Sequence, residues 1–133
     1  MNTIYAREDY LGADEYIDVV RKSGLNRSVD DRGRVERMLA HANLILTARQ
    51  DGKLVGFARS LTDFCFCCYL SDLAVDKACQ GQGIGKRLIE ETRTAAGGAL
   101  TTTLLLSAPT AMSFYQGIKM PQADNCFLYR RQK

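Results

Sequence analysis

The sequence predicts a single α/β domain whose strands and helices follow one another in the order β-α-α-β-β-β-α-β-α-β. A β-hairpin is indicated around Asp51-Gly52, where two aliphatic runs flank a two-residue turn. A long apolar run, residues 64–75, is typical of a strand covered on both faces of a sheet. A glycine-rich loop, residues 80–85, separates that strand from a helix-like segment. The 133 residues are enough for one self-sufficient core, so we expect one domain, residues 1–133.

The first third of the chain predicts one strand and two helices. Residues 3–7 are β-branched and aromatic, which favours a strand. Residues 13–22 cluster their apolar positions at helical spacing, and Ser23-Gly24 supplies a stop. A second helix is expected over residues 31–42, with Ser28 or Asp30 as its cap.

The hairpin strands are expected at residues 43–50 and 53–61, with Asp51-Gly52 in a type I′ turn. In the following strand, residues 64–75, even-numbered side chains should share one face and odd-numbered side chains the other. Both sets are largely apolar, so this strand should be central in the sheet.

The remainder of the chain predicts two more strands and two helices. A helix is expected over residues 86–95, with Leu88, Ile89 and Thr92 as its buried stripe. Residues 102–107 form a continuous apolar strand, and a short helix over residues 110–117 follows Pro109. Residues 126–130 are expected to be the last strand.

Composition and charge exclude several classes of protein. The net charge is +3, from 18 basic and 15 acidic residues, which is too weak and too dispersed to indicate nucleic-acid binding. The N-terminus lacks the pattern of a secretory signal, and no apolar run approaches the roughly 20 residues of a membrane span. We therefore expect a cytoplasmic protein without a membrane partner.

Cysteine and histidine are not arranged as a metal site. The five cysteines show neither a zinc spacing nor a disulfide framework, so we expect buried, reduced thiols and no metal. They are Cys65, Cys67, Cys68, Cys79 and Cys126. The lone histidine, His41, is more typical of a surface position than of a catalyst.

The glycine-rich loop lies between a strand and a helix, an arrangement that presents free backbone N–H groups and the positive helix end to an anion. It is not a Walker phosphate loop, because Gly85-Lys86 is followed by Arg87. It is not a Rossmann fingerprint either, because the third glycine is absent in both registers. A plain glycine-rich turn is the remaining alternative to a phosphate site.

The pattern Gln-x-x-Gly-x-Gly, Gln80 to Gly85, resembles motif A of the GCN5-related N-acetyltransferases (GNAT). The preceding Leu-Ala-Val-Asp of residues 73–76 and the later Ala111-x-x-Phe114-Tyr115 strengthen the resemblance, which covers almost the whole chain. It implies the GNAT acyl-CoA N-acyltransferase fold, an α/β (α+β) fold with a mixed central sheet of about six to seven strands flanked by four helices. It also implies acetyl-CoA as cosubstrate.

The resemblance implies cofactor-binding roles for the loop and for the strand before it. Glycines let the backbone approach a pyrophosphate without a Cβ in the way, and the amides of residues 82–86 should point at it. The strand is expected to splay from residues 102–107, leaving the backbone of Leu73 and Val75 to pair with the pantetheine arm. Lys86 and Arg87 should add positive charge. The implied binding residues are Leu73, Ala74, Val75, Gln80, Gly81, Gln82, Gly83, Ile84, Gly85 and Lys86.

Tyr115 is the implied catalytic residue, because a phenol near the sulfur can protonate the departing thiolate. The alternative is that Tyr115 packs in the core, as we expect of Phe114. The family usually has a Gly-Phe pair after this helix, where this chain has Ile118-Lys119-Met120. We therefore expect an altered final hairpin, and with it a different shape of the acceptor pocket.

The general base is left open. Some relatives carry a glutamate at the position of Tyr69. Asp72 is either a base or a buried structural carboxylate, and Tyr69 with Ser71 could instead hold a water. A covalent route through Cys79 is disfavoured, because no sequence neighbour would activate its thiol.

The acceptor is expected between residues 23–31 and the final hairpin. Asp30, Asp31 and the acidic first helix could attract a cationic amine, either a small molecule or a peptide lysine. Homodimers are common in the family, although the sequence does not indicate one. The expected activity is acetyl transfer to a primary amine by direct attack in a ternary complex, and the alternative is a non-catalytic acyl-CoA-binding or sensing module.

Overall fold

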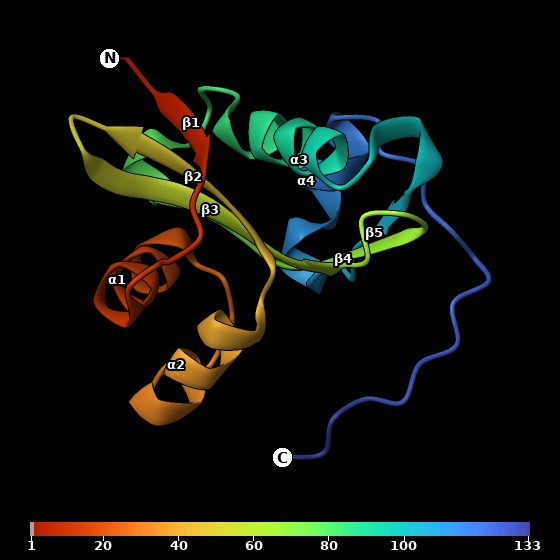
Figure 1. Ribbon diagram of the computed structural model, residues 1–133, viewed down its shortest axis with the longest axis horizontal. Helices are drawn as coiled ribbons and strands as arrows, with labels where there is room; N and C mark the ends of the chain where they lie inside the picture. Colours follow the sequence, from red (N-terminus) through yellow and green to blue (C-terminus); the bar gives the residue numbers. More distant parts are fainter. Residues whose placement is uncertain (1) are drawn as a thin grey trace.

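The computed structural model describes residues 2–133 as one five-stranded sheet with helices on both faces (Figure 1). The strand order is β1-β2-β3-β4-β5, and only the β4–β5 pair is parallel. The elements are β1 (Ile4–Arg7), α1 (Ala13–Ser23), α2 (Arg32–His41), β2 (Leu44–Gln50), β3 (Lys53–Thr62), β4 (Cys67–Val75), α3 (Ile84–Ala95), β5 (Thr102–Leu104) and α4 (Met112–Gly117). Within the described residues, every helix is too short or too polar to cross a membrane.

The sheet has five strands, so the expectation of six to seven strands is wrong. Residues 126–130 form no strand: Phe127 is 99% exposed, and the chain after α4 runs away from the sheet as an extended segment (Figure 1). No backbone pairing holds these residues, and a strand exists only where a neighbour supplies its hydrogen bonds. The expected final hairpin is therefore absent from residues 118–133, and β5 forms the sheet edge.

The hairpin between β2 and β3 is confirmed. Asp51 and Gly52 have φ values of 50° and 78°, the two positive values that a type I′ turn requires. The turn matches the right-handed twist of the flanking strands. In the sheet, β3 is the central strand, between β2 and β4.

Two apolar cores cover the two faces of the sheet. On one face, α1 and α2 bury Tyr16 and Val35 against Phe57 of β3. On the other, α3 buries Leu88 and Ile89 against β2, β3 and β4, as its predicted stripe indicated. Helix α2 is capped by the Asp31 side chain, not by Ser28 or Asp30.

The strand β4 contains a bulge that the expected alternation did not include. Arg59 pairs with Asp72 and Ser60 pairs with Leu70, so Ser71 is an extra residue on β4. Leu70 therefore packs on the α3 face together with Leu73, while Asp72 lies on the α1 face. The prediction of one continuous even and odd pattern over residues 64–75 is wrong beyond Leu70.

The strand β4 begins at Cys67, three residues later than expected, because Asp63 organises a turn before it. Its carboxylate accepts hydrogen bonds from the backbone N–H groups of residues 65–67 at 2.8–3.0 Å. The turn leaves Cys65 and Cys67 exposed. Cys126 is exposed as well, so buried thiols were the correct expectation only for Cys68 and Cys79.

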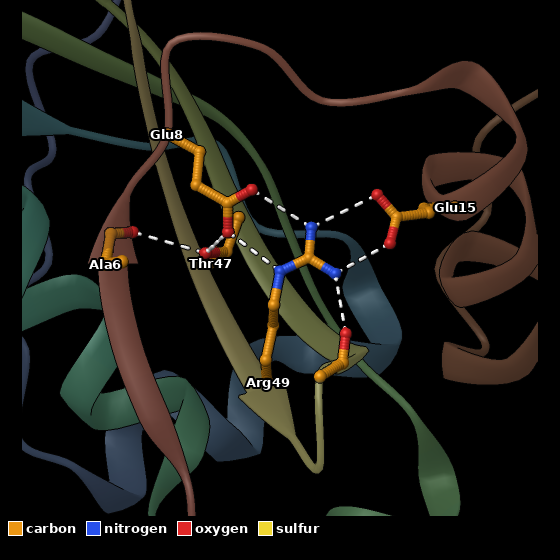
Figure 2. Close-up of polar contacts among 6 residues, drawn as sticks. Ala6, Glu8, Glu15, Thr47 and Arg49 are labelled. Atoms are coloured by element: carbon orange, nitrogen blue, oxygen red, sulfur yellow. Dashed lines mark hydrogen bonds and ion pairs between the residues drawn. The ribbon is translucent and has the colours of Figure 1, made fainter.

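An ion-pair cluster joins β1, β2 and α1 (Figure 2). Arg49 of β2 lies between Glu8, just after β1, and Glu15 of α1, with N···O distances of 2.9 Å and 2.7 Å for the closest contacts. The hydroxyl of Thr47 also bonds Glu8. Hydrogen bonding to Arg49 lowers the pKa of Glu8. The cluster fixes α1 relative to the sheet. It also pairs Glu15, one of the acidic residues of the first helix, with Arg49.

Candidate functional site

A cavity of about 820 Å³ opens between the end of β4, the glycine loop, α4 and the segment after α1. All predicted cofactor-binding residues line it except Gln82, and so does Tyr115. Further lining residues are Ser23, Gly24, Leu25, Asn26, Lys77, Ala108, Thr110, Ala111, Phe114 and Ile118. Elements far apart in the sequence thus meet at one hollow.

The glycine loop has the backbone of an anion site. Gly81 and Gly83 have φ values of 83° and 80°, a region that side chains disfavour, and Gly83 is the N-cap of α3. The first helical hydrogen bond runs from the Arg87 N–H to the Gly83 carbonyl, 3.0 Å away. The N–H groups of residues 84–86 therefore have no helical acceptor and are available to an anion.

Gly85 is needed for packing rather than for its φ value. A Cβ at this position would lie 2.9 Å from the ring of Phe114, too close for an ordinary contact. The bare backbone lets α4 approach the first turn of α3. Phe114 is 39% exposed and lines the cavity, so the expectation that it belongs to the buried core is wrong.

The strand β4 has an open edge beside the loop. Its pairing with β5 ends at Tyr69 opposite Leu104, so the rest of β4 has no neighbour on that side. Asp76 donates its N–H to Val55 of β3, and strand alternation therefore turns the backbone groups of Leu73 and Val75 toward the open edge. The pairing between these two strands thus ends before Leu73.

The two glutamines of the loop have separate positions. Gln80 donates to the carbonyls of Val75 at 3.0 Å and Ser23 at 3.3 Å, which ties the end of β4 to the end of α1. Gln82 turns away from the cavity and accepts a hydrogen bond from Gln50 of β2 at 3.1 Å. Its side chain is thus a support of the loop.

The cavity carries positive charge from Lys77 and Lys86. Arg87, which we expected to contribute, instead pairs with Glu91 at 2.8 Å, and its guanidinium lies over the ring of Tyr5. None of the lining residues named above has a carboxylate, so the electrostatics of the cavity favour an anion.

Tyr115 lies half-buried on the wall of this cavity. Its ring meets Phe114 edge to face, with 5.0 Å between centroids. Burial raises the pKa of the Tyr115 phenol above its ordinary value of 10.0, so the group is protonated at neutral pH. Tyr115 carries the one phenol among the lining residues of the cavity.

A family model described as "Acetyltransferase (GNAT) domain" matches residues 41–118, more than half of the chain. The chain belongs to the GNAT acetyltransferase family. The matched range contains the glycine loop, the open edge of β4 and Tyr115. The segment of residues 23–26, which also lines the cavity, lies outside it.

Curated relatives of this GNAT domain are longer proteins. The chain is 34% identical to the chloroplastic GCN5-related N-acetyltransferase 2 of Arabidopsis thaliana over 71 residues, which are 53% of this chain and 28% of the relative. It is 32% identical to the N-acetyltransferase ycf52 of Porphyra purpurea over 91 residues, 62% of this chain and 51% of the relative. The chain thus spans about half of the length of these relatives, or less.

Solved structures share the GNAT fold over the full chain. A GNAT-family acetyltransferase of Streptococcus pneumoniae has a TM-score of 0.78 at 18% identity, covering 99% of this chain and 100% of its own. The enzyme AAC(6′)-Iy, in complex with the bisubstrate analogue CoA-S-monomethyl-acetylneamine, has a TM-score of 0.72 at 15% identity, and both chains are covered completely. At these identities the likeness shows the fold alone.

The candidates for a general base do not line the cavity of this GNAT domain. Asp72 is buried and accepts hydrogen bonds from Tyr16 at 2.7 Å and Arg59 at 2.5 Å, and Arg27 forms an ion pair with its other oxygen at 2.5 Å. A carboxylate with this many partners fits a structural role, and its partners are side chains, not the backbone. Tyr69 and Ser71 are likewise absent from the lining.

The acidic residues expected to attract an amine are largely paired elsewhere. Glu15 binds Arg49, Asp14 binds Arg32, Asp18 binds Lys22, and Asp31 caps α2. The segment of residues 23–31 does reach the cavity, through residues 23–26. Among residues 2–133, no three or more His, Cys, Asp or Glu side chains are grouped to hold a metal ion.

Sequence reasoning missed three residues that support the site. Lys77 lines the cavity, Gln50 contacts the loop, and Arg27 reaches β4. Lys77 had a signal, since it lies between the Leu-Ala-Val-Asp motif and the loop. Gln50 and Arg27 had none, because they act on residues 32 and 44 positions away.

Proposed function

We propose that the protein is an acetyl-CoA-dependent N-acetyltransferase, which transfers an acetyl group to a primary amine by direct attack in a ternary complex. The observation that carries this proposal is the meeting of three features at one cavity: the free amides of the glycine loop, the open edge of β4 and a protonated Tyr115. Membership of the GNAT family supports the same reaction.

The donor would be held by backbone groups and by the residues around them. The N–H groups of residues 84–86 and the ammonium groups of Lys77 and Lys86 fit a pyrophosphate, because a helix N-terminus and nearby cations favour phosphate. The backbone of Leu73 and Val75 fits an extended amide-containing arm, which would lie along β4 as an added strand. The residues present therefore suit coenzyme A.

Tyr115 would act as the general acid. Acetyl-CoA supplies an acyl group activated as a thioester. As the amine nitrogen bonds to the carbonyl carbon and the carbon–sulfur bond breaks, Tyr115 donates its phenolic proton to the sulfur and regains one from solvent. The raised pKa of Tyr115 keeps that proton in place before the reaction.

The acceptor would enter against the segment of residues 23–26, which lines the cavity beside the end of β4. No carboxylate lines this wall, so we propose that the amine loses its proton to water and not to a direct protein base. The acceptor class is a small-molecule or peptide amine. A structure that shares the fold is described as an aminoglycoside acetyltransferase in complex with sisomicin, which makes aminoglycosides a reasonable first test.

The test is an acetyl-CoA consumption assay across polyamines, aminoglycosides, amino acids and lysine peptides, followed by the variant Tyr115→Phe. We expect kcat to fall by about 10²- to 10⁴-fold, the range for removal of a general acid. The Kd for acetyl-CoA should stay unchanged. Tyr129→Phe, in the exposed C-terminal segment, is the matched control and should behave as wild type.

Two results would count against the proposal in different ways. An unchanged rate for Tyr115→Phe would remove the role given to Tyr115 while leaving the transferase assignment intact. A wild-type protein that binds acetyl-CoA and acetylates no amine in the panel would favour the alternative, a non-catalytic acyl-CoA-binding or sensing module.

A further inference from the structure

Residues 23–26, which are the last residue of α1 and the three residues that follow it, form a wall of the cavity. The upstream end of this wall is held in place. Gly24 ends α1 in the left-handed conformation, and the Ser23 carbonyl accepts a hydrogen bond from Gln80 at 3.3 Å. The wall is therefore tied at this end to the glycine loop.

The downstream end is held by Arg27. Its Nη2 donates to the carbonyl of Ser71 at 2.9 Å and lies 2.5 Å from Oδ1 of Asp72. Its own N–H donates to the Leu25 carbonyl at 2.9 Å, which folds the wall back on itself. Arg27 thus connects residues 23–26 to the centre of β4, 44 positions away in the sequence.

The contact point on β4 is the bulge. Arg59 donates to the Ser71 hydroxyl at 3.0 Å and to Asp72 at 2.5 Å, and Tyr16 donates to Asp72 as well. Arg59 alone would neutralise the buried carboxylate. A second guanidinium, that of Arg27 with its side chain 31% exposed, exceeds what charge balance requires, and it attaches the chain that carries it to β4.

We infer that Arg27 is a positioning residue: by binding Ser71 and Asp72 it holds the wall of residues 23–26 at the distance from β4 that the acceptor requires. This inference rests on the proposed transferase function. The side chain of Arg27 contacts Ser71 and Asp72, whereas the proposed donor contacts lie on the glycine loop and on the backbone of residues 73–75. Acceptor binding should therefore depend on Arg27 more than donor binding does.

The test compares Arg27→Ala and Arg27→Lys with wild type. For Arg27→Ala we expect the acceptor KM to rise by about tenfold or more, because a displaced wall no longer orients the amine. The kcat at saturating acceptor and the Kd for acetyl-CoA should change by less than about threefold, because both depend on groups that stay in place. Arg27→Lys should rescue part of the loss, since an ammonium keeps the charge but not the forked geometry.

Hydrogen exchange supplies a readout that does not need activity. In Arg27→Ala the amides of residues 23–28 should exchange about tenfold faster, while those of β2 and α3 keep their wild-type rates. Arg32→Ala is the control, since Arg32 pairs with exposed Asp14 at the start of α2 and should change neither exchange in the wall nor the acceptor KM.

Each outcome decides the inference. Unchanged exchange in residues 23–28 of Arg27→Ala overturns it, and so does faster exchange spread evenly over the domain, which would mark a general loss of stability. An acetyl-CoA Kd that rises as much as the acceptor KM overturns the assignment to the acceptor. If Arg27→Ala does not fold, Arg27→Lys carries the same measurements. If wild type acetylates no amine, the proposed function fails. Faster exchange confined to residues 23–28 of Arg27→Ala would then still support the contact between Arg27 and β4, and its absence would reject that contact.

Discussion

The carboxylate of Asp63 accepts hydrogen bonds from three successive backbone N–H groups, those of residues 65–67. These bonds favour the charged form and lower the pKa of Asp63 from its ordinary 3.8 to about 2. A single exposed side chain therefore decides where β4 begins, because the turn it forms replaces strand pairing over the residues before Cys67.

The pH dependence of this turn follows from the sign of the shift. The folded pKa lies below the unfolded one, so the contribution to stability is complete above about pH 4 and is lost as the pH falls toward about 2. We expect Asp63→Asn to be less stable than wild type in urea at neutral pH and closer to it at the acid end of this range. Urea unfolding at both pH values measures the difference.

The control for this prediction is Asp124→Asn, in the extended segment after α4. It should match wild type at both pH values. An NMR titration of the Asp63 carboxyl with a midpoint near 3.8, and no pH-dependent gap between Asp63→Asn and wild type, would contradict the prediction.

At the level of elements, the glycine loop is supported from the end of β2. Gln50 is buried, and its amide nitrogen donates to Thr3 at 3.0 Å and to Gln82 at 3.1 Å. The thiol of Cys79 lies 3.6 Å from the side-chain oxygen of Gln50. The Gln50 side chain thus connects the residue before β1, the turn before the loop and the loop itself.

Gln50→Ala should weaken acetyl-CoA binding, although Gln50 does not line the cavity. Loss of these contacts frees the loop, and ordering it again on binding should raise the Kd by about 2- to 10-fold. The free energy of unfolding should fall by about 1 kcal/mol, the typical net value of a hydrogen bond. Isothermal titration and urea unfolding measure the two effects.

Gln122→Ala, in the exposed segment after α4, is the matched control and should alter neither quantity. A Gln50→Ala protein that loses stability but binds acetyl-CoA with the wild-type Kd would show that the loop keeps its shape without this support.

Local patterns explain which elements could be predicted. The Asp51-Gly52 turn and the buried stripe of α3 depend on neighbours in the sequence, and both were confirmed. The start of α3 at Ile84, two residues earlier than expected, reflects Gly83, whose left-handed conformation makes it the N-cap. The bulge at Ser71 was missed because it is defined by register with β3, which no single segment encodes.

In the candidate site, too, the features that depend on sequence neighbours could be predicted, and those that depend on distant contacts could not. The residues of the glycine loop and Tyr115 form recognisable motifs, and the structure places them at one cavity, with Gln82 outside it. The role of Arg27 depends on a contact across 44 residues, and residues 126–130 carry a strand-like pattern without a partner. Strand propensity describes fit to a neighbour, so it fails where no neighbour is present.

The whole molecule consists of one sheet with a core on each face, and residues 121–133 belong to neither core (Figure 1). Phe127 and Tyr129 bury almost none of their surface. Burial of apolar area is the main source of folding stability, so this segment should contribute little to it.

Deletion of residues 121–133 should therefore leave the domain folded. We expect Tm to change by less than about 3 °C, the shift that well under 1 kcal/mol produces in a domain of this size. The Kd for acetyl-CoA should be unchanged. Differential scanning calorimetry and titration check both values, and deletion of β1, residues 2–7, serves as the destabilising comparison because it removes a paired strand. A large fall in Tm on removing residues 121–133 would mean that the segment pairs with the sheet.

The bulge at Ser71 also constrains how the length of β4 can vary. The strand consists of two half-strands offset by one position, and Ser71 is the residue that makes up the offset. Without it, Asp72 and Leu73 would exchange sides: the carboxylate would enter the apolar core under α3, and the leucine would face the two guanidinium groups. Insertion or loss of a single residue between Cys67 and Val75 is therefore a change of chemistry on both sides of the sheet, whereas the same change in the segment after α4 is only a change of length.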